Sequence, residues 1–244
     1  MSREEQIITE RKKKLQGLRK FLNPYPYKFD VKNSSDEIKE KFKVLKNNQK
    51  GNKKVTVAGR VMSIRNLGKI IFVHIQDSRG KLQIILQDKE TNKKNFELFK
   101  KYIDVGDFVG CQGVVVKTKT GEISVLVKKL ELLTKALLPL PEKWHGLKDE
   151  EERYRKRYLD LIMNSEVKRI FDKRTEILDA IRELMKKKNI IEVETPYLQT
   201  IYGGALAKPF KTHLNALNVD LYLAISPELF LKRLVVGGYD KIFT

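Results

Sequence analysis

Short runs in which apolar and polar residues alternate fill the middle of the chain. A period of two is typical of β-strands that bury one face. Between the third and fourth runs, a segment with Phe96, Leu98 and Phe99 has the spacing of a helix. Five strands with one helical insertion in about 80 residues predict a small closed β-barrel of the OB type, an architecture that often binds nucleic acids. The runs cover residues 55–64, 70–77, 81–87, 105–117 and 122–132.

A helical pattern precedes the barrel. In residues 3–20, apolar residues recur at helical intervals among lysines and arginines, which predicts a basic amphipathic helix. Three roles are open for it: contact with RNA through the charges from Arg11 to Lys14, docking by its apolar edge, and binding to an anionic membrane. Asn23-Pro24-Tyr25-Pro26 ends the helix, because proline pushes the preceding residue out of the α region. The polar residues 47–52 predict a linker.

Helix and strand patterns follow each other after the barrel. Leu138-Pro139-Leu140-Pro141 ends the barrel region, since two prolines cannot continue a strand ladder. Apolar residues from Val167 to Met185 predict a long helix, and Ser226 before Pro227 predicts a second one with Ser226 as its N-cap. The last predicted strand has no visible partner, so we expect an unfinished sheet. The predicted strands are residues 190–194, 221–225 and 239–244.

Strand parity places one aromatic side chain among polar ones on the outer face of the barrel. The residues predicted to face outward are Phe72, His74, Gln76, Lys81, Gln83, Glu122 and Ser124. Phe72, with hydrogen-bonding neighbours and Arg65 nearby, offers what stacking on an unpaired base and reading its edge require. The alternative is that residues 1–54 cover Phe72.

The charge balance indicates a polyanionic partner. The 244 residues include 50 Lys and Arg against 31 Asp and Glu, a net charge of +19. The excess is concentrated in the first 140 residues, and neutralised phosphates release counterions when such a surface binds nucleic acid. A basic surface that is merely solvated is the alternative.

Other features of the composition exclude several classes of protein. A single cysteine, Cys111, cannot form an intramolecular disulfide, and with three histidines it gives no metal-ligand spacing. There is no long apolar run and no secretory signal in the first residues, so we expect a cytoplasmic protein that does not span a membrane.

From the barrel onward the sequence resembles the class II lysyl-tRNA synthetases, over essentially all of residues 54–244. The strings that carry the resemblance are Val57-Ala58-Gly59-Arg60-Val61-Met62, Gly68-Lys69, Gln76-Asp77, Lys117-Thr118-Lys119-Thr120-Gly121-Glu122, Thr134-Lys135-Ala136-Leu137, His145-Gly146-Leu147, Arg157-Tyr158-Leu159-Asp160-Leu161, Glu192-Val193-Glu194-Thr195-Pro196, Gly203-Gly204-Ala205, Pro209-Phe210, Thr212-His213 and Pro227-Glu228-Leu229. Each is weak alone, but together and in order they are specific.

The resemblance implies a function and a set of site residues. It implies that Phe72 stacks on the central anticodon base of lysine tRNA, that Gln83 and Glu122 bond its edge, and that Arg65 lies nearby. It also implies that Gly204 and Glu228 receive the α-amino group of lysine, and that the motif 1 segment ending at Pro196 forms a homodimer interface. The complete enzyme is expected to use ATP and Mg²⁺ to attach lysine to tRNA.

The resemblance further implies that motifs 2 and 3, which bind ATP and metal, lie beyond Thr244. The chain alone is therefore expected to be inactive, and a separate polypeptide is one possible source of the other half. Ala224, Leu214 and Lys208 depart from the family's usual Arg, His and Arg, which puts full activity in question.

The expected organisation has four parts: a basic helical extension and linker (1–54), an OB-fold anticodon-binding domain (55–135), a linker (136–160) and the start of an antiparallel-sheet class II catalytic domain (161–244). Two alternatives are a catalytically inactive fragment that binds tRNA or dimerises, and a synthetase of the aspartyl or asparaginyl type.

Overall fold

The computed structural model describes residues 2–141, 147 and 149–244. The chain forms two compact units, residues 1–146 and residues 147–244. His145 and Gly146, which the sequence analysis singled out, lie outside the described residues.

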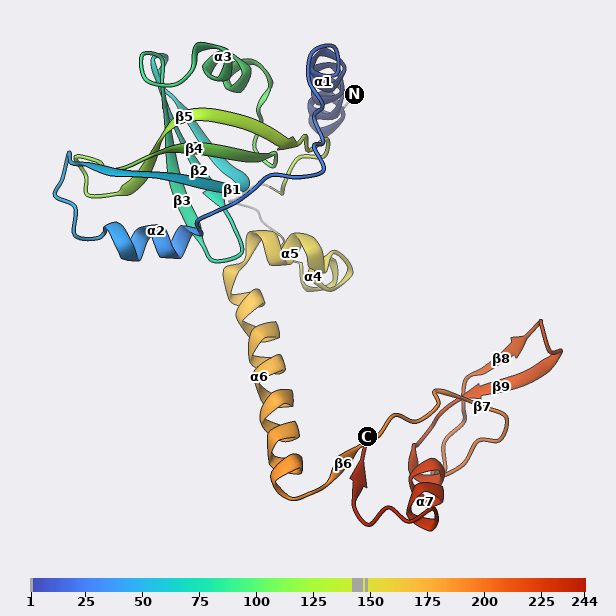
Figure 1. The fold of residues 1–244 in the computed structure, drawn as a ribbon. Helices are drawn as coiled ribbons and strands as arrows, with labels where there is room; N and C mark the ends of the chain where they lie inside the picture. The colour runs from blue at the N-terminus through green and yellow to red at the C-terminus, as the bar shows by residue number, and fades with distance from the viewer. Residues whose placement is uncertain (1, 142–146, 148) are drawn as a thin grey trace. The chain divides into compact units, whose positions relative to one another are not determined.

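A closed five-stranded barrel forms most of the first unit (Figure 1), as the alternating runs predict. Its strands are β1 (Lys50–Asn66), β2 (Ile70–Gln76), β3 (Lys81–Gln87), β4 (Phe108–Lys117) and β5 (Ile123–Thr134). They are arranged in the order β1-β2-β3-β5-β4, in which β3 and β5 pair in parallel and the other pairs are antiparallel.

The barrel interior is packed with branched apolar side chains. Val61, Val73, Ile84, Val109 and Val125 are fully buried, because alternate residues of each strand point to the same face. Helix α3 (Lys93–Tyr102) follows β3 and buries Phe96 and Phe99 against this core, which confirms the predicted helical insertion.

Two helices precede the barrel, where the sequence predicts only one. Helix α1 (Arg3–Leu18) begins with a capping box between Ser2 and Glu5 and buries Leu15 and Leu18. Helix α2 (Ser35–Phe42) buries Ile38 and Phe42 in the same core. Strand β1 starts at Lys50, so the end of the predicted linker is already strand.

Helix α1 docks by its apolar edge, and its charges divide into two groups. The Arg11 side chain is only 7% exposed and donates to the carbonyl oxygens of Val105, Ala136 and Leu138. Lys14 donates to Asp104 at 2.6 Å. Of the charges from Arg11 to Lys14 that could contact RNA, these two bond within the barrel unit, whereas Lys12 and Lys13 are exposed.

A buried ionic cluster fixes the end of the barrel beside α1. The Lys135 ammonium is fully buried and donates to Asp107, to Asp104 and to the carbonyl of Tyr102. Burial raises the pKa of Asp107, although Lys135 opposes the shift. Burial would also raise the pKa of Asp104, but hydrogen bonds from Lys135 and Lys14 outweigh it and lower the pKa.

The second unit is open and has few buried residues. Its helices are α4 (Glu150–Arg155), α5 (Arg157–Met163), α6 (Ser165–Lys187) and α7 (Glu228–Val236). Its strands are β6 (Ile191–Glu192), β7 (Leu198–Gln199), β8 (Lys211–Leu214), β9 (Val219–Leu223) and β10 (Ile242–Phe243). Strands β7, β9 and β8 form an antiparallel sheet.

Two predictions for this unit are wrong. The last strand does have a partner, because β10 pairs in parallel with β6. Helix α7 begins one residue late, with Pro227 as its N-cap, although the Ser226 hydroxyl still accepts the Glu228 N–H at 3.2 Å. Among the described residues, no helix combines the length and hydrophobicity that crossing a membrane needs.

Candidate nucleic-acid interface

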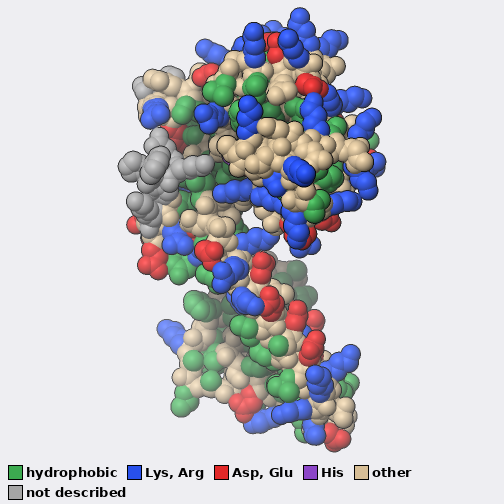
Figure 2. All heavy atoms as spheres, turned by 90° about the vertical axis from the view of Figure 1, so that its left-hand side faces the viewer, with side chains coloured by type: hydrophobic (Ala, Val, Ile, Leu, Met, Phe, Trp, Pro, Cys, Tyr) green, Lys and Arg blue, Asp and Glu red, His purple; other side chains and the backbone are tan. Residues whose placement is uncertain are grey.

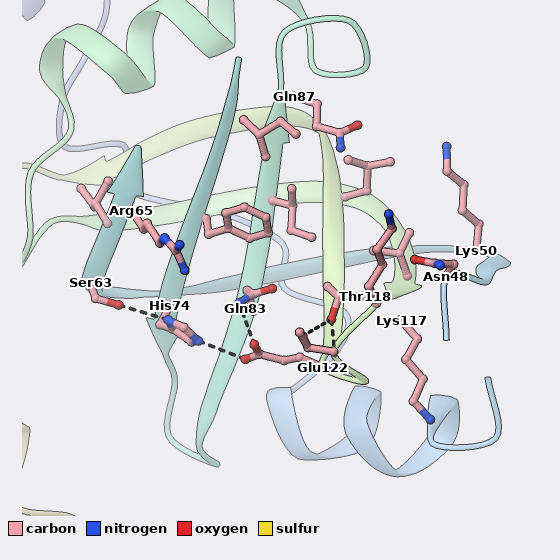
Figure 3. A pocket seen from close by; sticks show the side chains of 18 residues that line it. Asn48, Lys50, Ser63, Arg65, His74, Gln83, Gln87, Lys117, Thr118 and Glu122 are labelled. Carbon is pink, nitrogen blue, oxygen red and sulfur yellow. Dashed lines mark hydrogen bonds and ion pairs between the residues drawn. The ribbon is translucent and has the colours of Figure 1, made fainter. Parts of the chain in front are cut away.

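A cavity of about 770 Å³ lies on the outer face of the barrel (Figure 3). Strands β1, β2 and β3 form its floor, and the turn between β4 and β5 forms part of its wall. Arg65, Phe72, Gln83 and Glu122 all line it, so the structure brings together the four residues that the sequence analysis selected for the barrel.

Phe72 provides the aromatic surface of this cavity. It lies on β2 opposite Arg65 of β1 and Ile85 of β3, and its side chain is half-buried. Phe72 stays partly exposed, and from residues 1–54 Asn48 and Lys50 line the same cavity. A ring held by two neighbouring strands can stack on a base without first being ordered.

Polar side chains next to Phe72 form a continuous hydrogen-bonded chain (Figure 3). The Gln83 amide donates to Glu122 Oε2 at 2.7 Å, and Gln83 Oε1 accepts from the Ser124 hydroxyl at 2.8 Å. On the other side, His74 Nε2 lies 3.0 Å from Glu122 Oε1, and His74 Nδ1 lies 3.1 Å from Ser63 Oγ. Both oxygens of the Glu122 carboxylate are therefore held from two different strands.

A tight turn delivers Glu122 to this position. The Thr118 hydroxyl accepts the Glu122 N–H at 3.0 Å, and the Thr118 N–H donates to the Glu122 carbonyl at 3.0 Å. Gly121 has φ of +87°, a conformation that residues with a Cβ rarely adopt. The turn at Thr118-Lys119-Thr120-Gly121 therefore needs the Thr118 hydroxyl and the Gly121 backbone to place Glu122 in the cavity.

Gln83 lines the cavity on the outer face, as parity predicts, but it is more buried than an outward position suggests. Its side chain is only 7% exposed. Strand β3 lies between β2 and β5, and every residue from Leu82 to Leu86 is buried. Because a buried amide needs partners, the bonds to Glu122 and Ser124 fix its orientation.

Basic residues surround the cavity. Lys50, Arg65, Lys117 and Lys119 line it, and Figure 2 shows many further Lys and Arg side chains over the barrel. Lys50 pairs with Glu90, and Lys117 donates to the carbonyls of Lys43 and Leu45. Arg65 and Lys119 are exposed, so they can meet a phosphate at the cavity rim.

Sequence reasoning did not select His74, Ser63 or Ser124. Strand parity already places His74 and Ser124 on the polar face, and this could have identified them as site residues. Ser63 follows a register shift in β1 between Val61 and Ser63. Counting alternate residues across a β-bulge fails, so the sequence could not bring Ser63 to His74.

In the second unit, the two residues predicted to bind lysine, Gly204 and Glu228, lie close together, whereas Pro196, predicted for the dimer interface, is in a separate segment. Gly204 has φ of +88°, and a Cβ there would lie 3.3 Å from the Glu228 Cβ. Glu228 opens α7 and bonds Lys232 at 2.5 Å. Pro196 is exposed between β6 and β7. Across the described residues, no group of three or more His, Cys, Asp or Glu could hold a metal ion.

Family comparisons agree with the two units. An OB-fold nucleic acid binding domain matches residues 55–133, and the class II tRNA synthetases (D, K and N) match residues 149–244. The lysine–tRNA ligase of Fervidobacterium nodosum is 50% identical over 222 residues, which is 91% of this chain and 43% of that protein. Over nearly its whole length the chain is thus similar to class II lysine–tRNA ligases.

Other relatives carry the same name. The lysine–tRNA ligase of Methanoculleus marisnigri is 52% identical over 94% of this chain and 45% of that protein. The one of Thermotoga maritima is 48% identical over 96% of this chain and 47% of that protein. The chain thus spans less than half the length of these relatives, and they do not favour the aspartyl or asparaginyl alternative.

Proposed function

We propose that this chain is part of a lysine–tRNA ligase, the ATP-dependent enzyme that attaches lysine to tRNA, and that its barrel binds the anticodon. The identity of its relatives as lysine–tRNA ligases and the OB-fold match support this. In this proposal residues 1–54 form a basic extension, residues 55–135 the anticodon-binding domain, residues 136–160 the linker and residues 161–244 the start of the catalytic domain.

The observation that carries the proposal is Phe72 beside the Gln83–Glu122 pair in one cavity. Phe72 stacks on a splayed base, a contact worth about 1 to 3 kcal/mol. The Glu122 carboxylate can only accept hydrogen bonds, and Gln83 keeps a second N–H to donate. A base edge with an N–H beside a carbonyl suits this pair, as N3–H and O4 of uracil do.

Cytosine fits the same pair poorly. Its N3 is an acceptor and would face the Glu122 carboxylate without a proton between them, which leaves two acceptors in contact. The pair therefore favours uracil over cytosine at the centre of the anticodon loop. Arg65 and the exposed Lys12 and Lys13 contact phosphates and add affinity without sequence preference.

The second unit contributes to lysine binding and assembly in this proposal. Gly204 and Glu228 lie close together, and a carboxylate with one free oxygen suits the α-amino group of lysine. Several apolar side chains of α6 are exposed, including Ile170 and Ile177, which supports a homodimer contact through motif 1 and Pro196. The protein works in the cytoplasm.

ATP and Mg²⁺ are expected for the complete ligase. Neither unit offers a metal-binding cluster among the described residues, so we derive no catalytic step through either group. The proposal assigns both to residues beyond Thr244, in the same chain or in a separate polypeptide.

The test is binding of four anticodon stem-loops that differ only in the central base. Fluorescence anisotropy with the 244-residue chain should give the tightest binding for uracil, and binding about tenfold weaker for cytosine, since a good base contact is worth about 1 to 3 kcal/mol. Glu122→Ala should remove this preference. Equal affinity of the wild-type chain for all four stem-loops would contradict anticodon reading.

A further inference from the structure

His74 lies at the edge of the cavity and touches two partners from different strands. Its Nε2 is 3.0 Å from Glu122 Oε1, and its Nδ1 is 3.1 Å from Ser63 Oγ. The side chains of His74 and Glu122 are 40% and 42% exposed, so the pair is open to a ligand. Nothing in the base contacts described above requires an imidazole at this place.

The hydrogen bonds determine which ring nitrogen carries the proton. A carboxylate only accepts, so the proton is on His74 Nε2 and is donated to Glu122. In the neutral ring Nδ1 is then an acceptor, and it takes the hydrogen of the Ser63 hydroxyl. This assignment follows from the partners of the ring. The chain runs from Ser63 through His74 to Glu122, and from Ser124 through Gln83 to the same carboxylate.

We propose that His74 is a positioning residue that holds Glu122 in the conformation in which it meets a base; this rests on the proposed function of the cavity. A free glutamate side chain populates several rotamers, and ordering it costs conformational entropy. His74 and Gln83 hold one carboxylate oxygen each, so that cost is met before RNA arrives. Each oxygen keeps a lone pair for the base, and binding loses less entropy.

This role differs from a contribution to folding. The barrel core beneath His74 is formed by its neighbours Val73 and Ile75, which are buried, whereas His74 itself is on the outer face. Removing the imidazole should therefore leave the barrel folded and change only how well Glu122 is placed. The consequence is a loss of base discrimination, since contacts to phosphates do not pass through Glu122.

The test compares two replacements with a matched control. His74→Phe keeps a ring but has no donor, and His74→Gln keeps an N–H that can reach Glu122. His213→Phe is the control, because His213 also bonds a carboxylate, that of Asp220 at 2.9 Å, but lies outside the barrel. The readout is the ratio of Kd values for stem-loops with central cytosine and central uracil.

We expect His74→Phe to reduce this ratio about five- to tenfold, which removes most of the preference, because Glu122 is then no longer held in one conformation. His74→Gln should restore most of it, and His213→Phe should leave it unchanged. In a Glu122→Ala background His74→Phe should have no further effect, because coupled residues are not additive. If His74→Phe lowers the melting temperature, His74→Asn, which is too short to reach Glu122, replaces it.

Two results would overturn the inference while leaving the proposed function intact. One is a wild-type ratio in both His74→Phe and His74→Asn. The other is that His74→Phe reduces the ratio of Kd values by the same factor in the wild-type and the Glu122→Ala backgrounds. A wild-type chain that does not discriminate between the stem-loops would instead overturn the proposed function, and the inference with it.

Discussion

Replacing Arg11 tests whether helix α1 is held to the barrel by a buried charge. The guanidinium donates from Nη1 to the carbonyl of Leu138 at 2.9 Å and to that of Ala136 at 3.3 Å, and from Nη2 to that of Val105 at 2.8 Å. Arg11→Leu keeps an apolar stem but leaves three carbonyl oxygens without this donor.

The size of the effect follows from these contacts. A hydrogen bond to a charged group contributes about 1.5 to 3 kcal/mol, and the long bond to Ala136 contributes least. Water reaches part of the vacated carbonyls, so we expect a net loss of about 3 kcal/mol rather than the full sum. Since 1.4 kcal/mol is a factor of ten, the amide protection of α1 should fall by about a hundredfold.

Hydrogen exchange followed by mass spectrometry measures this directly, because it reports on α1 separately from the second unit. Lys13→Leu on the same helix is the control: Lys13 is exposed, and its replacement should change α1 protection by less than threefold, or about 0.5 kcal/mol. Unchanged protection of α1 in Arg11→Leu would refute this account of the docking.

Three further predictions follow from other parts of the chain. Lys12→Gln with Lys13→Gln should weaken all anticodon stem-loops equally and lower the salt slope of log K by about 1 to 2, measured by anisotropy over a salt series; a loss confined to one stem-loop would contradict this. Burial raises the pKa of Cys111 from 9.0 to about 12. The protonated thiol therefore makes its full contribution to the folding free energy below pH 9.0, and this contribution is lost as the pH rises toward 12. A thiol reagent at pH 8 should therefore label Cys111 only after unfolding, and rapid labelling of the folded chain would be evidence against its burial. Because the proposal assigns the groups that bind ATP and Mg²⁺ to residues beyond Thr244, the 244-residue chain alone should give no lysine-dependent pyrophosphate exchange; measurable exchange would show that the ATP site is misassigned.

The barrel could be predicted because its strands bury one face. Alternation at Ile71, Val73 and Ile75 fixes which side chains face the core, and the same parity puts Phe72 and His74 in the cavity. The predicted helix in residues 3–20 and the insertion around Phe96 also correspond to α1 and α3. These features depend on local periodicity, which a single sequence carries.

Features that depend on distant partners could not be predicted. Arg11 and Lys12 are adjacent basic residues that the sequence does not distinguish. Arg11 is buried because it bonds carbonyl oxygens of residues more than ninety positions away. Helix α2 has eight residues, too few for a clear period. Gln83 is buried on a strand that lies between two others, and β10 pairs with β6, which comes much earlier in the sequence.

The most direct test of the central claim is the effect of Phe72→Ala on binding of the lysine anticodon stem-loop. Tyr27→Ala is the control, because Tyr27 is an aromatic residue with a 100% exposed side chain that does not line the cavity. With stacking worth about 1 to 3 kcal/mol, Phe72→Ala should raise the Kd for the loop with central uracil about tenfold or more and reduce the preference over other loops. Tyr27→Ala should leave both unchanged. An equal loss of affinity for cognate and non-cognate loops in Phe72→Ala would contradict base reading by this cavity.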